Sequence, residues 1–407
     1  MKKAVKILLG IFILVFISTV LVMAGSGFKI VRHPSPDDWG RGVIKTFPAK
    51  AQDSTFDLRC YDLTSLNLKD KMNDLLFCDF DSKTKWPASL PQGFNPAKIM
   101  ELGKNPGLGI RSLHKKGITG KGIAIAIIDQ TLLVDHVEYK DRLKLYEEIP
   151  AQKDWNAAMH GGALASIAVG KTVGVAPGAD LYYIAAQFIG RDYTLGKGFK
   201  GRDFTWVAKS IDRVIEINKK LSKDKKIRVI AIAAGWDKNE DGYKEIVAAV
   251  EKAKKEGIFV VSSSINETYA GDKIAFNGLG RLPMNDPEKA ASYAPGLWWA
   301  DGFFKTGKMF FDYKCLLVPM DSRCTASPNG NKDYVFYRSG GWSWSIPYIA
   351  GLYALACQAK PNITPQEFWG KALKTGDAIT LKNNGKNINF EVIVNPVKLI
   401  KDIQDNK

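Results

Sequence analysis

The chain has 407 residues, of which 45% are hydrophobic and 25% are charged, and its formal net charge is +16. This composition is typical of a globular protein with a sizeable core, and no internal repeat or low-complexity tract is present. The positive charge favours contact with anionic surfaces such as membrane lipids or cell-surface polymers. The lysine clusters, such as residues 223–226, lack interleaved aromatic residues, so a nucleic-acid partner is not expected.

Residues 1–24 have the pattern of an export segment, because three lysines precede an uncharged apolar stretch at residues 7–23. A cleavage site fits after Ala24, whereas the length of the apolar stretch also fits an uncleaved membrane anchor. Lysines on the N-terminal side place the rest of the chain outside the cytoplasm in either case. We therefore expect an extracytoplasmic protein that is secreted or membrane-anchored.

An oxidising location makes disulfides possible among the five cysteines. The pairs that are near in sequence are Cys60 with Cys78 and Cys315 with Cys324. We expect these two disulfides and a free, buried Cys357, although five cysteines permit many other connectivities.

Residues 25–105 contain many turn-forming and polar residues, and we interpret them as a pro-segment or an N-terminal extension. The pattern changes in residues 106–407, which we expect to form one domain. Apolar runs there are typical of strands buried on both faces of a parallel sheet. These runs lie at residues 123–128, 181–186, 229–234 and 258–263.

A helical pattern at residues 243–256 lies between the last two of these runs and ends at Gly257. Strands that alternate with helices predict an α/β fold of three layers, a doubly wound and mainly parallel sheet with helices on both faces. Ligands of such folds bind at the carboxyl ends of the strands. Residues 364–367, Thr-Pro-Gln-Glu, predict the start of a further helix.

Three residues are candidates for catalysis. Asp129 ends the first buried strand, where a carboxylate is costly unless it has a function or caps a turn. His160 precedes glycines and small residues that let a helix start close to neighbouring backbone. Ser343 begins an apolar helix with Pro347 in its first turns, where free backbone N–H groups can stabilise an oxyanion. Each has a structural alternative, and for Ser343 it is an ordinary N-cap.

The other histidines offer weaker hypotheses. His33 lies near the export segment and His114 in a basic turn. His136 has acidic neighbours, but no further His or Cys stands at metal-ligand spacing, so we expect a polar loop and no metal site.

The three candidate segments, in their order and spacing, resemble the subtilisin-like serine peptidases, the subtilases. The resemblance covers about residues 106–400. It rests on the strand that ends at Asp129, on His160 with the Gly-Val-Ala-Pro stretch at residues 174–177, and on Gly341, Ser343 and Pro347. In addition, residues 262–266 resemble the family's small-residue run that ends in the oxyanion asparagine, here Asn266.

The resemblance implies a serine endopeptidase that acts on proteins or peptides without a cofactor or a metal. Asp129, His160 and Ser343 would form the catalytic triad, and Asn266 would donate to the oxyanion. Ala233, Ala234, Gly235 and Trp236 would form an extended edge for the main chain of the substrate.

Two alternatives to an active peptidase remain, and the second comes from another class of protein. Trp342 and Trp344 replace the smaller residues that flank the nucleophile in the family, which allows a catalytically silent subtilase fold that only binds. The glycines at residues 196–201 match a dinucleotide-binding fingerprint, but this motif does not directly follow a strand, so a basic loop is expected instead.

Overall fold

The computed structural model describes residues 28–50, 55–151, 154–188, 201–309 and 311–405. The export segment predicted at residues 1–24 and all but Gly201 of the glycine motif lie outside this description. Among the residues that are described, no helix combines the length and apolar character needed to cross a membrane.

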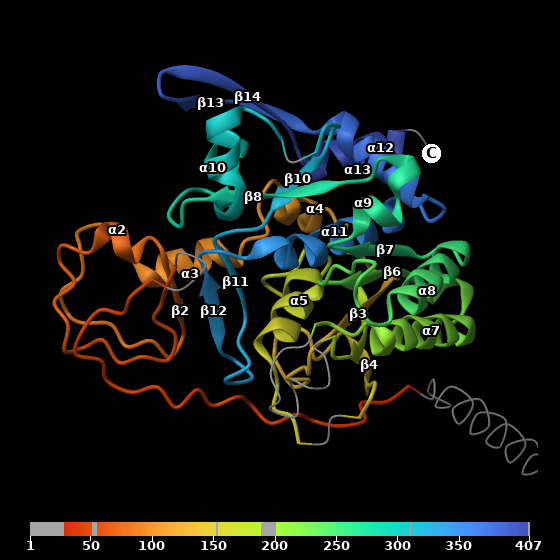
Figure 1. The fold of residues 1–407 in the computed structure, drawn as a ribbon, viewed down its shortest axis with the longest axis horizontal. Coiled ribbons are helices and arrows are strands. Elements are labelled where there is room, and N and C mark those ends of the chain that lie inside the picture. The colour runs from red at the N-terminus through yellow and green to blue at the C-terminus, as the bar shows by residue number, and fades with distance from the viewer. Residues whose placement is uncertain (1–27, 51–54, 152–153, 189–200, 310, 406–407) are drawn as a thin grey trace, which may run out of the picture.

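A five-stranded sheet lies at the centre of the molecule (Figure 1). Its strands are arranged in the order β4-β5-β3-β6-β7, and every neighbouring pair is parallel. Four of them match the predicted apolar runs to within two residues, and β4 was not predicted. The strands are β3 (Ala124–Asp129), β4 (Leu143–Glu148), β5 (Asp180–Ala185), β6 (Ile227–Ile232) and β7 (Phe259–Ser262).

Helices cover both faces of this sheet. Successive side chains of a strand point to opposite faces, so Ile125 and Ile127 of β3 enter one buried cluster and Ala126 and Ile128 another. The predicted three-layer α/β fold is therefore confirmed. The first cluster contains α5 (Met159–Val169) and α11 (Gly341–Ala359), and the second contains α7 (Thr205–Lys220) and α8 (Tyr243–Lys255).

A second sheet of five strands follows in the C-terminal part of the chain, in the order β13-β14-β10-β8-β9. Asn384 and Gly385 join β13 to β14 and both have positive φ, which is the backbone geometry of a tight hairpin turn. The strands are β8 (Phe276–Arg281), β9 (Tyr293–Pro295), β10 (Leu316–Pro319), β13 (Asp377–Asn383) and β14 (Lys386–Ile393).

A third sheet joins the N-terminal segment to the rest of the chain, in the order β1-β2-β12-β11. Two of its strands come from residues 55–81 and two from residues 323–337, and helix α3 packs against β11. The elements are β1 (Phe56–Asp57), α2 (Met72–Leu75), β2 (Cys78–Asp81), α3 (Pro96–Lys104), β11 (Arg323–Ala326) and β12 (Tyr334–Tyr337).

The remaining helices surround these sheets, and α12 begins where the sequence predicts a helix start. The hydroxyl of Thr364 accepts a hydrogen bond of 3.1 Å from the backbone N–H of Glu367 and caps α12. Helix α13 begins at Pro396, after the capping side chain of Asn395. These helices are α4 (Ile110–Lys115), α9 (Ile265–Thr268), α10 (Leu297–Thr306), α12 (Pro365–Thr375) and α13 (Pro396–Asp405), with 3-10 turns at Lys223–Lys225, Ala270–Asp272 and Ala290–Ser292.

The disulfide prediction is wrong, because all five cysteines are free thiols in the structure. The Sγ of Cys60 donates to Asp81 at 2.9 Å, whereas Cys78 lies at the other end of β2 and donates to the carbonyl of Asp74. Cys315 directly precedes β10 of the second sheet, whereas Cys324 lies in β11 of the third sheet. Burial raises the pKa of the Cys357 thiol to about 11, and this cysteine is free as predicted.

Candidate active site

The carboxyl edge of the central sheet brings three of the predicted segments together. Asp129 is the last residue of β3, Ala233 follows β6, and Asn266 lies in α9 just after β7. Since β3, β6 and β7 are parallel neighbours, these residues emerge on one side of the sheet. This is the side where ligands of doubly wound sheets bind.

Asp129 and His160 form a hydrogen-bonded pair at this edge. The Oδ1 atom of Asp129 lies 2.8 Å from Nδ1 of His160, and the Asp129 side chain is only 1% exposed. The same carboxylate accepts a hydrogen bond from the backbone N–H of Gln130. An acceptor at Nδ1 fixes the proton of a neutral imidazole on that atom and leaves Nε2 as the basic nitrogen.

The glycine after His160 is required by a close approach. His160 is the second residue of α5, and a Cβ atom at Gly161 would lie 2.2 Å from the Tyr183 hydroxyl and 2.8 Å from the carbonyl of Gln130. Only a residue without a side chain lets the helix start so close to the strand end that carries Asp129. The glycine after His160 therefore does what the sequence suggested, which is to let the helix start close to neighbouring backbone.

The environment of His160 changes its pKa in two opposing ways. Burial alone would lower the pKa, but the charge of Asp129 and its hydrogen bond raise it above the ordinary value of 6.5. Because the folded pKa is raised, this pair stabilises the fold fully below pH 6.5, and the stabilisation is lost as the pH rises through the folded pKa.

We expect the imidazole of His160 to titrate with a midpoint above 6.5, and a reaction in which it acts as general base should share that midpoint, because a general base must be neutral. It should fall in Asp129→Asn, which removes the charge that raises the pKa. The pH profile of kcat/KM, supported by NMR titration of the imidazole, measures this. A midpoint below 6.5 in the unmodified protein would show that burial dominates.

Ser343 is the third residue of α11, in the first turn, where backbone N–H groups have no partner within the helix. Gly341 precedes it with a φ of +58°, a conformation that favours glycine. The next residue, Trp344, places its ring centroid 5.4 Å from that of His160. The start of the serine helix therefore lies beside the histidine, although no hydrogen bond joins Ser343 to His160 within the described part of the chain.

Two tryptophans form an aromatic wall next to Ser343. The indole N–H of Trp342 donates to Oδ1 of Asn277 at 2.9 Å, which fixes the ring. Trp298, at the start of α10, meets Trp342 edge to face at 5.1 Å and is 45% exposed. Apolar surface is thus presented to solvent beside the candidate nucleophile.

The predicted substrate edge is tied to the segment that leads to Asn266. The carbonyl of Ala234 accepts from the N–H of Ser263 at 3.1 Å, and the N–H of Trp236 donates to the Ser264 hydroxyl at 3.0 Å. The main chain of residues 233–236 therefore uses its β7 side for these bonds. The Trp236 ring is buried and packs against Phe204, so its side chain belongs to the core.

The other three histidines lie apart from this pair, and each has a bond of its own. The exposed ring of His33 bonds the carboxylate of Asp135 at 2.7 Å. The ring of His114 bonds the carbonyl of Val175, and that of buried His136 bonds the carbonyl of Asp333.

Asp321 supports the start of the serine helix and was not predicted. Its buried carboxylate accepts hydrogen bonds from the N–H of Gly340 at 3.1 Å and from the N–H of Leu297 at 2.8 Å. It thereby ties the first residues of α11 to those of α10. Burial raises the pKa of Asp321 to about 6. Its partners lie 19 and 24 residues away in sequence, so no local pattern reveals this role.

Comparison with known proteins agrees with the sequence resemblance. Residues 120–302 match the model of the Subtilase family. The resemblance to the subtilases is thus confirmed. The matched segment contains Asp129, His160 and Asn266, whereas Ser343 lies beyond it. The match supports a serine peptidase that acts on protein or peptide substrates.

A solved structure, that of the prenylagaramide maturation protease PagA, is also similar to this subtilase-like chain. The two share 16% sequence identity, with a TM-score of 0.46, over 72% of this chain and 98% of that one.

Proposed function

We propose that this protein is an exported serine endopeptidase with Asp129, His160 and Ser343 as its catalytic triad. One observation carries the proposal: a buried carboxylate orients an imidazole at the carboxyl edge of the sheet, beside the start of the Ser343 helix. The match of residues 120–302 to the subtilases supports the same chemistry.

The reaction follows from these positions. Nε2 of His160 takes the proton of the Ser343 hydroxyl as its oxygen attacks the peptide carbonyl, and Asp129 stabilises the imidazolium that forms. The tetrahedral intermediate collapses to an acyl-enzyme when the imidazolium gives the proton to the departing amine. Water then attacks the acyl-enzyme while Nε2 of His160 takes its proton, and the second tetrahedral intermediate collapses, releasing the acid and regenerating Ser343. The backbone N–H of Ser343 and the Asn266 amide would stabilise the oxyanion.

The replacement Asn266→Ala should lower kcat by about 10² to 10³-fold with little change in KM. The reason is that the amide would donate only when charge develops on the carbonyl oxygen. Steady-state kinetics on a peptide substrate measure both constants. A raised KM with unchanged kcat would instead make Asn266 an ordinary substrate contact.

The substrate main chain would pair with residues 233–236 on the side away from β7. Strand addition of this kind uses backbone groups and gives affinity with little sequence preference. The exposed ring of Trp298 would then contact an apolar substrate side chain near the scissile bond.

The alternative function is a catalytically silent subtilase fold that binds peptides at the cell surface. The contact of Trp344 with His160 favours it, since the ring fills space next to the base. Incubation with an unstructured protein separates the two functions. The peptidase releases new α-amino groups at internal sites, whereas the silent fold holds the protein without cutting it.

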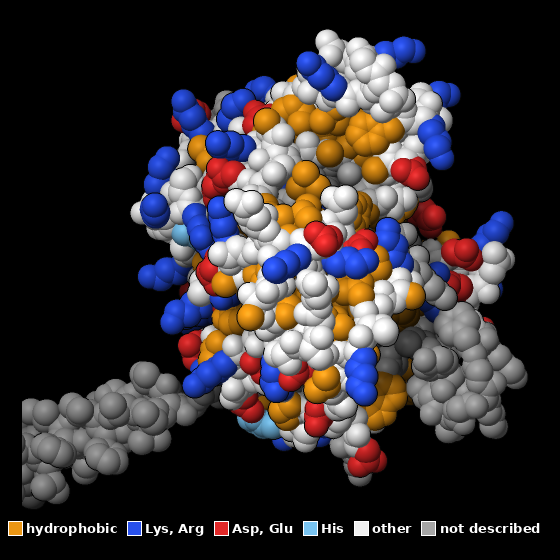
Figure 2. All heavy atoms as spheres, turned by 90° about the vertical axis from the view of Figure 1, so that its left-hand side faces the viewer, with side chains coloured by type: hydrophobic (Ala, Val, Ile, Leu, Met, Phe, Trp, Pro, Cys, Tyr) orange, Lys and Arg blue, Asp and Glu red, His pale blue; other side chains and the backbone are white. Residues whose placement is uncertain are grey.

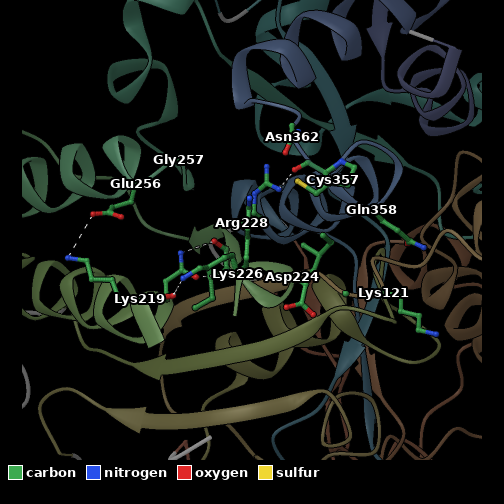
Figure 3. A pocket seen from close by; sticks show the side chains of 16 residues that line it. Lys121, Lys219, Asp224, Lys226, Arg228, Glu256, Gly257, Cys357, Gln358 and Asn362 are labelled. Atoms are coloured by element: carbon green, nitrogen blue, oxygen red, sulfur yellow. Dashed lines mark hydrogen bonds and ion pairs between the residues drawn. The ribbon is translucent and has the colours of Figure 1, made fainter. Parts of the chain in front are cut away.

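We also propose that the protein works outside the cytoplasm, secreted or anchored by residues 1–24, near anionic lipids or polymers. A pocket of about 850 Å³ supports the anionic contact (Figure 3). It lies at the starts of β3 and β6, opposite the triad edge, and lysines and an arginine outnumber the acids around it. On another face, Lys and Arg side chains are widely spread (Figure 2).

Removing Lys121 and Lys223 from this pocket should weaken binding to vesicles that contain anionic lipid, by about fivefold for each lysine at low salt. Vesicle sedimentation of Lys121→Gln and Lys223→Gln measures this. Lys382→Gln, on β13, is the matched control. Equal binding by all three variants, or binding that is insensitive to salt, would place the contact elsewhere.

A further inference from the structure

The N-terminal segment contributes an inner strand to the third sheet. Strand β2 lies between β1 and β12 and pairs with β12 in antiparallel register, with Phe80 opposite Phe336. Both rings are 1% exposed and their centroids are 5.1 Å apart. Loss of this segment would expose the edge of β12 and one side of Phe336.

Helix α3 of the same segment approaches β11 more closely than side chains allow. A Cβ atom at Gly103 would lie 2.9 Å from the backbone nitrogen of Cys324. Such contact is characteristic of elements that fold together in one core, because it needs a matched backbone surface on both sides.

Buried polar groups also cross this boundary. Arg338 is 3% exposed, and its Nε atom donates to the carbonyl of Leu76 at 3.0 Å. Its backbone N–H donates to the carboxylate of Asp79 at 2.7 Å. Without residues 76 and 79 the Nε atom and the backbone N–H of Arg338 would lose these acceptors, and buried polar groups without partners destabilise a fold.

Residues 28–38 form a second set of contacts, with the central sheet and with the residues that precede α5. Ile30 forms a bridge to Tyr146 on the free edge of β4, and Arg32 pairs with Glu148. Further along, the carbonyl of Ser35 accepts from the N–H of Ala157, three residues before His160. The segment therefore covers the edge strand β4 and holds the backbone that leads to His160.

A row of aromatic contacts links the segment to His160. Nη1 of Arg59 donates to the Tyr337 hydroxyl at 3.3 Å, and its guanidinium lies 5.4 Å from the ring centroid. Tyr337 meets Trp344 edge to face at 5.3 Å, and Trp344 contacts His160. Arg59 itself is held by a bidentate pair with Asp57.

We propose that residues 28–105 remain part of the folded, active protein instead of being removed as a pro-segment, and that Arg59 is a positioning residue for His160. The second statement rests on the proposed peptidase function. The first rests on the shared sheet, the shared core and the contacts of residues 28–38, which hold whether or not the protein is catalytic.

The native mass of the exported protein, made from the full chain and treated with a small fluorophosphonate, tests retention. We expect the labelled species to contain residues 28–105, continuous or nicked but still bound. A labelled species that lacks them overturns the proposal. Without labelling, the peptidase function fails, but the native mass of the folded protein still decides whether the segment is kept.

Kinetics of Arg59→Ala test positioning, with Arg41→Ala as the control. Both arginines pair with Asp57 and lie over the ring of Trp39, but the hydrogen bond and ring contact to Tyr337 come from Arg59. The titratable group that acts on His160 is Asp129, and those that act on Arg59 are Asp57, Asp79 and Tyr337.

We expect Arg59→Ala to lower kcat about tenfold with little change in KM, and to raise the pH midpoint as water reaches the imidazole. Arg41→Ala should change neither. The same kcat and midpoint in folded Arg59→Ala, or an equal effect of Arg41→Ala, would contradict the role. Circular dichroism establishes that each variant is folded.

Discussion

Replacing Ser343 by alanine should lower kcat for peptide hydrolysis by about 10⁶-fold, the magnitude seen when a related triad loses its nucleophile. The residual rate would come from substrate binding and from the oxyanion donors, which the replacement leaves in place. KM should change little, because a serine hydroxyl contributes little to ground-state binding. Single-turnover and steady-state kinetics on one peptide substrate measure both effects.

The same helix supplies the control. Ser345, two residues along α11, is buried, and its hydroxyl has no hydrogen-bond partner within the described residues. Ser345→Ala removes a similar atom without touching the proposed chemistry and should leave turnover within about threefold. If Ser343→Ala kept its activity while folded, the nucleophile would be another group. If both variants lost activity equally, the cause would be damage to the helix.

The replacement Asp129→Asn should lower kcat by about 10⁴-fold without unfolding the protein. An amide at this position no longer holds the proton on Nδ1 of His160 and no longer stabilises the imidazolium in the transition state. The Asp129 side chain is only 1% exposed. Asparagine has nearly the same size as aspartate, so the replacement fits the same buried space.

A second aspartate-histidine pair provides a matched comparison. Asp135 binds His33 at 2.7 Å, the same type of contact, but both side chains are more than half exposed. Asp135→Asn should leave turnover unchanged. Full activity of Asp129→Asn would show that His160 is not the general base, and a loss in Asp135→Asn would indicate a role for the N-terminal segment at that pair.

The sequence predicted the central sheet because its inner strands carry their own signal. Residues 124–129 are buried on both faces, and such strands appear as continuous apolar runs. Strand β4 has no such run, since it lies at the edge and carries Lys144, Glu147 and Glu148. The third sheet was not predicted because β2 pairs with β12, more than 250 residues away.

The candidate site likewise contains residues that local sequence patterns predict and residues that they do not. Asp129 and His160 were predicted and are hydrogen-bonded in the structure, because each stands in a local pattern of strand end or helix start. The aromatic row from Tyr337 to Trp344 and the support by Asp321 depend on tertiary contacts, which local patterns do not contain. The cysteine pairs failed because nearness in sequence did not bring the sulfur atoms together.

Reaction of the protein with a small fluorophosphonate, mapped by peptide mass spectrometry, tests the proposed triad most directly. An ordinary serine is a poor nucleophile at neutral pH, whereas one beside a neutral imidazole and an oxyanion site reacts irreversibly. Labelling should occur at Ser343 alone, disappear in Ser343→Ala, fall steeply in His160→Ala and decrease at acid pH. A small probe avoids exclusion by Trp342 and Trp344. No labelling of the folded protein, or labelling that persists in His160→Ala, would contradict the triad.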